Sequence, residues 1–228
     1  MELLAGSDVD RLLAELHLLP AQDVIHALFS AICRPEVPLR WHAVQAMGVS
    51  VARLADTDME AARIVMRRLL WSLNEESGGI GWGAPEALAE IICRHEGLAG
   101  EYGHMLISYM RDDGPELFQE GNFLEHPVLQ QGLLWGVGRL AEVRPKLLRE
   151  GGVAADLLFY LDSADHVVRG LAARALGLLP APEAAAVIAQ LAGDTTPVSL
   201  YEAGTLRAMT VEGLGREALQ RIHSAEVH

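Results

Sequence analysis

Residues 166–179, HVVRGLAARALGLL, contain the pattern that decides the fold. Between Val168 and Leu179 the apolar side chains recur at i, i+3, i+4, i+7, i+8 and i+11, which places them on one stripe of a helix. Residues 101–111, EYGHMLISYMR, repeat this pattern, whereas no run of four to eight residues alternates as a hairpin strand would. We therefore expect an all-α chain of about eleven or twelve helices.

The expected helix starts have recognisable capping chemistry. Thr57 and Glu60 have the spacing of a capping box, in which a hydroxyl and a carboxylate bind each other's unpaired backbone amides. Pro127, Pro182 and Pro197 stand where a first helical residue is expected, because the missing N–H of proline would be unpaired there anyway. These signals predict short helices joined by tight connections.

A helical pair recurs along the chain. Segments that align as the second helix of such a pair are registered on Arg40, Glu86, Gln130 and Arg169, with steps of 46, 44 and 39 residues, and the same register aligns Gly48, Gly138 and Gly177. An apolar segment precedes each second helix, at 24–33, 60–73, 101–111 and 153–161, and a weaker fifth pair is expected at 183–191 and 198–209. Each pair can bury its apolar face only against its neighbours, so the repeat predicts an α-solenoid of about five pairs.

The repeating pair resembles the HEAT-repeat α-solenoids. Residues 165–177 are especially similar to the phycobilisome-lyase-type HEAT-like subgroup, whose second helix has the form D-x-x-V-R-x-x-A-x-x-A-L-G. The matching residues are Asp165, Val168, Arg169, Ala172, Ala175, Leu176 and Gly177, and the segment 39–48 matches almost as well. The resemblance covers about residues 20–210. It implies a superhelical stack in which Arg40, Asp165 and Arg169 join a polar ladder between repeats, and one solenoid domain over 1–228 with capping helices at its ends.

Charge and hydropathy exclude several classes of partner. Lysine and arginine total 18 against 31 aspartate and glutamate, a net charge of −13, which argues against nucleic acid and favours a protein partner with a basic surface. The longest uncharged apolar run, 126–138, has 13 residues and is too short for a membrane span. The first ten residues lack the basic start and apolar core of a signal peptide, so we expect a cytoplasmic protein.

Residues 74–86, NEESGGIGWGAPE, form the most unusual stretch of the chain. Four glycines surround Trp82, and Glu75 and Glu76 precede them. Glycine permits positive φ and close backbone approach, so this loop can fold back and present the tryptophan. Two interpretations stay open: Trp82 fills a gap between repeats, or the loop binds a partner or a small ligand.

The second helices of such solenoids line the concave face, so polar side chains there are candidates for binding. With the loop, the candidate binding residues are Arg40, His42, Glu75, Glu76, Trp82, Glu86, His126 and Gln130. No arrangement of nucleophile and base indicates an enzyme. We therefore expect a non-enzymatic interaction module that binds a partner segment in its concave groove. The alternative is a small-ligand or metal-binding protein, or a lyase-like enzyme, that uses the loop 74–86.

The sequence predicts neither a cofactor nor a metal site. The single pair His95-Glu96 is similar to the iron-binding pairs of deoxyhypusine hydroxylase, but it lies near the end of its expected helix, and one pair cannot form a dinuclear site. A single-metal site formed by His42, His126 and the acids of 75–86 remains an alternative, because these are hard or borderline ligands.

Overall fold

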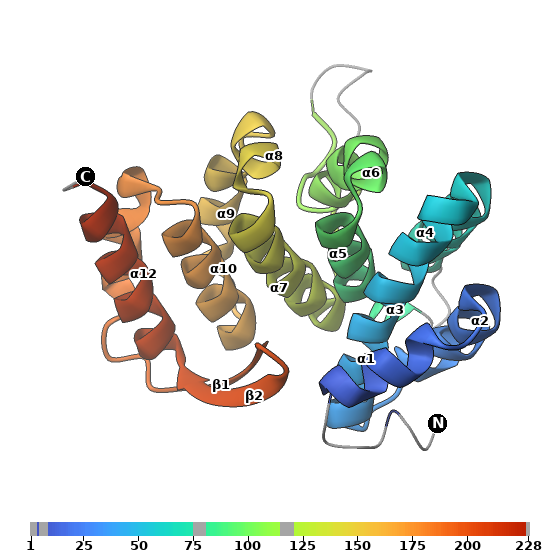
Figure 1. Ribbon diagram of the computed structural model, residues 1–228. Coiled ribbons are helices and arrows are strands. Elements are labelled where there is room, and N and C mark those ends of the chain that lie inside the picture. The colour runs from blue at the N-terminus through green and yellow to red at the C-terminus, as the bar shows by residue number, and fades with distance from the viewer. Residues whose placement is uncertain (1–3, 5–8, 75–80, 115–120, 227–228) are drawn as a thin grey trace. The chain divides into compact units, whose positions relative to one another are not determined.

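The computed structural model describes residues 4, 9–74, 81–114 and 121–226 (Figure 1). The chain divides into two compact units, residues 1–106 and 107–228. The described residues form twelve α-helices, in agreement with the expected number. None of these helices has the length and apolar character needed to cross a membrane. The single domain over 1–228 stays a prediction.

The first unit consists of consecutive helices joined by short connections. They are α1 (Val9–His17), α2 (Ala21–Ala31), α3 (Val37–Thr57), α4 (Met59–Leu73), α5 (Ala84–Arg94) and α6 (Glu96–Ser108), whose last two residues belong to the second unit. Helix α3 packs against α2, α4 and α5. Helix α5 is buried from Ala84 to Cys93. The first unit therefore has its core around the second helices α3 and α5, while α2 and α4 are the first helices of their pairs.

The second unit has the same construction with shorter first helices. Its elements are α7 (Pro127–Val143), α8 (Pro145–Glu150), α9 (Val153–Tyr160), α10 (His166–Leu178), η3 (Pro182–Ala184), α11 (Ala185–Ile188), η4 (Ala189–Leu191), β1 (Pro197–Glu202), β2 (Thr205–Thr210) and α12 (Val211–Glu226). Helix α10 packs against α7, α9 and α12. The stripe predicted in residues 166–179 is buried, and Val168, Ala172 and Ala175 have no exposed surface.

Residues 197–210 form a β-hairpin, so the helix expected at 198–209 is wrong. The strands β1 and β2 are antiparallel, with Val198 opposite Met209. The turn residues Ala203 and Gly204 have φ of 48° and 79°, the positive values that a two-residue hairpin turn requires. Val198 is buried on β1, whereas most of β2 is exposed. The fifth helical pair is therefore α11 with α12, and the hairpin lies between them in the chain.

Two side chains of the second helices anchor this hairpin. The indole Nε1 of Trp135 on α7 donates a hydrogen bond to the carbonyl oxygen of Tyr201 at 2.8 Å. Arg174 on α10, whose side chain is 3% exposed, binds the carboxylates of Glu202 at 2.8 Å and of Glu142. The burial of a charged side chain is tolerated here because two carboxylates face it.

The predicted glycine column marks close approaches between successive second helices. A Cβ at Gly48 would lie 3.0 Å from Arg94 Nε, one at Gly138 would lie 2.5 Å from Arg174 Nη1, and one at Gly177 would lie 2.4 Å from Ala218 Cα. In the first two cases the missing side chain makes room for an arginine of the next second helix. In the third case it lets the backbones of α10 and α12 approach each other directly.

The helix starts are only partly as predicted. Pro127 begins α7 and Pro182 begins η3, as expected, whereas Pro197 begins a strand. The expected capping box is wrong, because Thr57 ends α3. Asp58 caps α4 instead, and its carboxylate accepts the Ala61 amide at 3.0 Å without a reciprocal side-chain bond from Ala61. A carboxylate at this position satisfies the same unpaired amides as a hydroxyl would.

Candidate functional site

Among the predicted binding residues that the structure describes, Glu86 is the most deeply buried. It lies in the first turn of α5 and is 3% exposed. Its Oε1 lies 4.0 Å from Arg40 Nη2, and its Oε2 has no hydrogen-bond partner among the described residues. Burial raises the pKa of the Glu86 carboxyl, and the positive charge of Arg40, 4.0 Å away, only partly opposes this increase. Glu86 is therefore a buried core residue, and little of its side chain is exposed to contact a partner.

The end of the glycine-rich stretch is packed against Ile32, the residue that follows helix α2. Gly83 precedes α5 with a φ of 78°, and a Cβ at this position would lie 2.3 Å from the carbonyl oxygen of Ile32. Both the left-handed backbone and the close approach require glycine here. Trp82 is half-buried next to it. Glu75 and Glu76, together with residues 77–80, lie outside the described residues.

Arg40 and His42 both belong to the first turns of α3 but make different contacts. The Arg40 guanidinium lies 5.1 Å from the ring centroid of Trp41, a cation–π distance. His42 is 4% exposed, and its Nδ1 lies 2.9 Å from the carbonyl oxygen of Leu4. His42 therefore ties Leu4 to the second helix of the first pair.

His126 and Gln130 belong to the second unit. The Nδ1 of His126 accepts the Val128 amide at 3.2 Å and so caps α7, while its side chain remains exposed. Gln130 is half-buried on the same helix. The structure thus distributes the predicted residues over two units and gives one member of each unit, His42 and His126, a structural hydrogen bond.

The predicted polar ladder runs through successive repeats of the second unit. Asp165 caps α10 by accepting the amides of Val167 and Val168, and it also accepts the Gln131 side-chain amide at 2.8 Å. One repeat further, Arg169 donates to Asp194 at 2.6 Å. The pKa of Asp194 falls to about 2, because the Thr196 hydroxyl and the Arg169 guanidinium both bind its carboxylate.

Metal-ligating side chains do not gather in the part of the chain that the structure describes. Within these residues, no group of three or more His, Cys, Asp and Glu side chains is placed to hold a metal ion. His95 of the His-Glu pair caps α6 by accepting the Leu98 amide at 3.2 Å. The single-metal alternative also relied on Glu75 and Glu76, which lie outside the described ranges.

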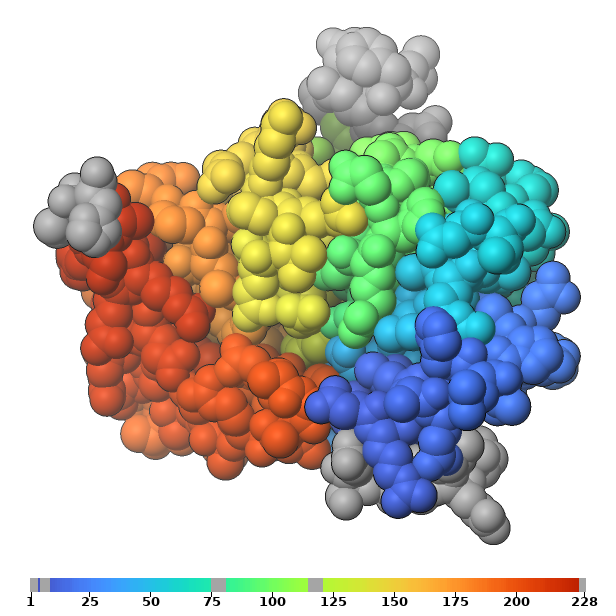
Figure 2. All heavy atoms as spheres, in the orientation of Figure 1, coloured from blue at the N-terminus to red at the C-terminus, as the bar shows by residue number. Residues whose placement is uncertain are grey.

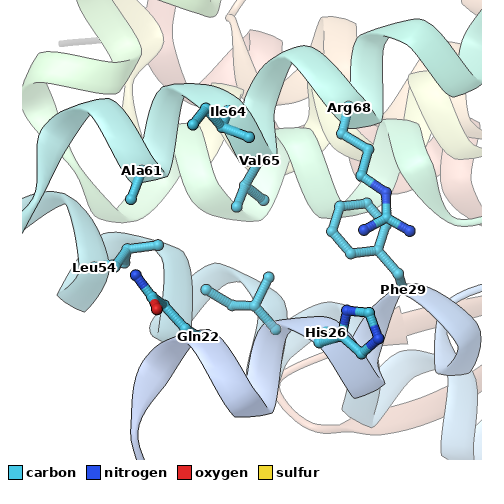
Figure 3. Close-up of a pocket in the computed structure, with 9 residues that line it drawn as sticks. Gln22, His26, Phe29, Leu54, Ala61, Ile64, Val65 and Arg68 are labelled. Atoms are coloured by element: carbon cyan, nitrogen blue, oxygen red, sulfur yellow. The ribbon is translucent and has the colours of Figure 1, made fainter.

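A groove between the first helices α2 and α4 is a hollow surface that the sequence did not predict (Figure 3). A pocket of about 250 Å³ is lined by Ile25, His26 and Phe29 of α2 and by Ile64, Val65 and Arg68 of α4. A second pocket of about 150 Å³ continues past Phe29 and Arg68 to Cys33 and Trp71. We call these two pockets together the α2/α4 groove. In Figure 2 both helices reach the surface of the first unit, in blue and cyan.

The Arg68 guanidinium separates the two pockets. It lies 3.8 Å from the centroid of the Phe29 ring, and Figure 3 shows it spread over that ring. Large apolar side chains on either side remain open to solvent: Ile64 is 57% exposed and Trp71 is 56% exposed. The groove is therefore an apolar surface with one cation at its middle.

The sequence contains a weak signal for this groove. Ile64, Arg68 and Trp71 are spaced i, i+4, i+7 on α4, beside the buried stripe that includes Val65 and Leu69. An apolar residue at 64 and another at 71 make the apolar surface of α4 wider than packing on α3 and α5 requires. Periodicity does not give the position of α2 relative to α4. The sequence therefore does not tell which of these side chains line a gap between the two helices.

Comparison with known proteins places the chain in a fold class. No family model matches the sequence, and the comparison with curated proteins gives no match either. Among solved structures, an engineered protein is similar with a TM-score of 0.53 and 18% identity, covering 98% of this chain and 94% of its own. A designed armadillo repeat protein is similar with a TM-score of 0.51 and 17% identity, covering 97% of both chains.

A third neighbour comes from computationally designed armadillo repeat proteins for modular peptide recognition. Its TM-score is 0.50 at 17% identity, and the match covers 96% of this chain and 97% of that one. At such identities the likeness concerns the fold alone. The predicted fold class, an all-α helical-repeat solenoid, is confirmed.

Proposed function

We propose that the chain is a protein-interaction module that binds a segment of a partner protein in the α2/α4 groove. The observation that carries this proposal is the exposed apolar groove itself, with Ile64 and Trp71 more than half exposed. Contiguous apolar surface of this kind on a soluble fold marks interaction sites. A designed neighbour with the same fold is described as made for modular peptide recognition, which supports the same class of function.

The groove is a better-supported place for binding than the concave face predicted from the sequence. Of the predicted residues on the second helices, His42 and Glu86 are 4% and 3% exposed, so little of either side chain can touch a ligand. Binding on the second-helix face, through Arg40 or Gln130, stays a prediction. So do the similarity to the phycobilisome-lyase-type subgroup, the basic partner surface, the cytoplasmic location and the non-enzymatic role.

Trp71 is the side chain on which this function depends most. A tryptophan that becomes buried on binding is a typical interface hot spot, and its truncation costs about 2 kcal/mol or more of binding energy. Because 56% of Trp71 is exposed in the free chain, the same truncation removes few core contacts. Trp71→Ala should therefore lower the affinity for the partner while it changes the free energy of unfolding only slightly.

The test is a selection of random peptides of about 16 residues, long enough for about four helical turns, on the full chain. Affinities of the selected peptides are then measured for the wild type, Trp71→Ala and the control Leu18→Ala, an apolar residue outside the groove that is 84% exposed. We expect Trp71→Ala to weaken binding about 30-fold, the equivalent of about 2 kcal/mol, and Leu18→Ala to leave it unchanged. Equal affinities for all three proteins would refute the proposed site.

A further inference from the structure

The lining of the α2/α4 groove has a charge opposite to that of the chain. The chain carries 31 carboxylate side chains and a net charge of −13. None of the residues that line the two pockets, all of them described, is acidic, and Arg68 is the permanently charged one. The neighbouring acid on α4, Glu60, is already bound by Arg67 at 2.6 Å and Arg63 at 3.5 Å. Charge complementarity at this groove therefore favours an anionic group on the ligand.

The Arg68 side chain is oriented so that it can bind such a group. Its guanidinium stacks on Phe29, and among the described residues it has no hydrogen bond or ion pair. A stacked guanidinium keeps its N–H edge free, and that edge matches a carboxylate in a two-pronged contact. Because stacking fixes the plane of the side chain, less conformational freedom is lost when the contact forms.

The spacing of the two pockets sets the spacing of the ligand's apolar residues. Ile64 borders one pocket and Trp71 the other, seven residues apart on α4, which corresponds to about 10 Å along the helix axis. A helix lying along the groove spans this distance between its residues i and i+7. A residue at i+3 or i+4 of the same helix then lies opposite Arg68.

The walls of the groove also favour a helix over an extended segment. Both walls are helices, whose backbone groups are already paired within each helix, so they offer an extended chain no ladder of hydrogen bonds. Ser72, at the border of the second pocket, already donates its hydroxyl hydrogen to the carbonyl oxygen of Leu69 at 2.7 Å. An extended peptide would bury unpaired N–H and C=O groups, whereas a helix satisfies its own.

We infer that the α2/α4 groove binds an amphipathic helix of a partner protein, with large apolar residues at i and i+7 and a carboxylate at i+3 or i+4 that pairs with Arg68. This inference rests on the proposed function and specifies its ligand. The groove is thus expected to prefer an acidic ligand group, whereas the net charge of the whole chain predicts a partner with a basic surface.

The experiment uses helical peptides of one sequence with leucine at i and i+7, and with glutamate, glutamine or lysine at i+3 and i+4. Dissociation constants are measured at low salt, because exposed ion pairs are screened, for the wild type and Arg68→Glu. The comparison variant is Arg67→Glu, which makes the same charge change one residue away on α4 but outside the groove. It also breaks the ion pair between Arg67 and Glu60, so any general effect of added negative charge on α4 is at least as large in this variant as in Arg68→Glu. Sedimentation of the peptide-free chain is measured alongside.

We expect the wild type to prefer the glutamate peptide over the lysine peptide by about tenfold, the scale of one charge-assisted contact. Arg68→Glu should invert this order, and Arg67→Glu should keep it. Equal affinities for the peptides, or an equal inversion by both variants, would overturn the inference. A peptide-free dimer that Trp71→Ala dissociates would also overturn it, because the occupant would then be a second copy.

The two proposals fail in different ways. If the selected peptides of the previous experiment depend on Trp71 but none of the helical peptides binds, the partner class inferred here is wrong and the interaction site stands. If neither set of peptides responds to Trp71→Ala, the proposed function itself fails. Arg68→Glu and Arg67→Glu are first compared by thermal unfolding, so that a loss of fold is not mistaken for a loss of binding.

Discussion

Replacement of Gly177 by alanine tests how closely successive second helices pack. The added Cβ would lie 2.4 Å from the Cα and 2.7 Å from the Cβ of Ala218, whereas contacting carbon atoms are about 3.5–4.0 Å apart. Helices α10 and α12 would have to move apart by about 1 Å, the difference between these distances. Overpacking of this kind costs about 1–3 kcal/mol, and the better helix propensity of alanine offsets at most about 1 kcal/mol of it.

Gly100→Ala is the matched control. Gly100 also lies within a helix, α6, but a Cβ there would have no neighbour within 4 Å. Alanine should therefore raise stability at position 100, by up to about 1 kcal/mol. Thermal unfolding followed by circular dichroism should show a melting temperature several degrees lower for Gly177→Ala than for Gly100→Ala, since 1 kcal/mol corresponds to about 2–4 °C in a chain of this size. Equal melting temperatures would refute the close approach of the second helices.

Three further predictions concern buried and hydrogen-bonded groups. Burial raises the pKa of Glu86 above 4.5, so the protonated carboxyl stabilises the fold fully below pH 4.5 and this stabilisation is lost at higher pH. In denaturant unfolding, the free energy of unfolding of Glu86→Gln should therefore rise relative to that of the wild type as pH rises. A difference that stays constant with pH would contradict this. The pKa of Asp194 is lowered from 3.8 to about 2, so the ionised carboxylate stabilises the fold above this range. The difference in free energy of unfolding between the wild type and Asp194→Asn, measured in the same way, should therefore shrink as pH falls through this range. A difference that persists at low pH would contradict this. Gly83→Ala should lower the free energy of unfolding by more than about 2 kcal/mol, because a left-handed backbone and a clash with the Ile32 carbonyl act together. A variant as stable as the wild type would mean that Gly83 is not packed against Ile32.

The sequence predicts the helices well where the pattern and the end signals agree. In α10 the apolar stripe and the repeat register indicate the same helix. The structure has a helix from His166 to Leu178, and Asp165 caps its start. The glycine column was also found from the register, because a glycine at the same position of several second helices is expected only where neighbouring helices come close. These are properties of one repeat and its nearest neighbour.

The hairpin shows where this reasoning fails. Residues 197–210 occupy the place of a second helix in the register, so their position in the repeat predicts a helix. The strand signals in this stretch are short, because Val198 and Leu200 alternate with Ser199 over three residues only and a two-residue turn ends in Gly204. The buried contacts of Trp135 and Arg174 then fix the hairpin, and these contacts could not be derived from the segment itself.

The candidate site was harder to predict than the fold. Arg40, His42 and Glu86 are polar residues of the second helices, but periodicity does not say whether such a residue contacts solvent or another part of the chain. The exposure of Ile64 and Trp71 depends on the gap that α2 and α4 leave between them. That gap is a property of the packed unit, so it became visible only in the structure.

Photo-crosslinking decides most directly whether the partner segment lies in the α2/α4 groove. A benzophenone amino acid replaces Ile64 in the groove of one protein and Gln45, a half-buried residue of the second helix α3, in another. Each protein is irradiated with the same selected peptide. Crosslinking from position 64 and not from position 45 is the predicted result, whereas crosslinking from position 45 alone would contradict the groove and favour the second-helix face.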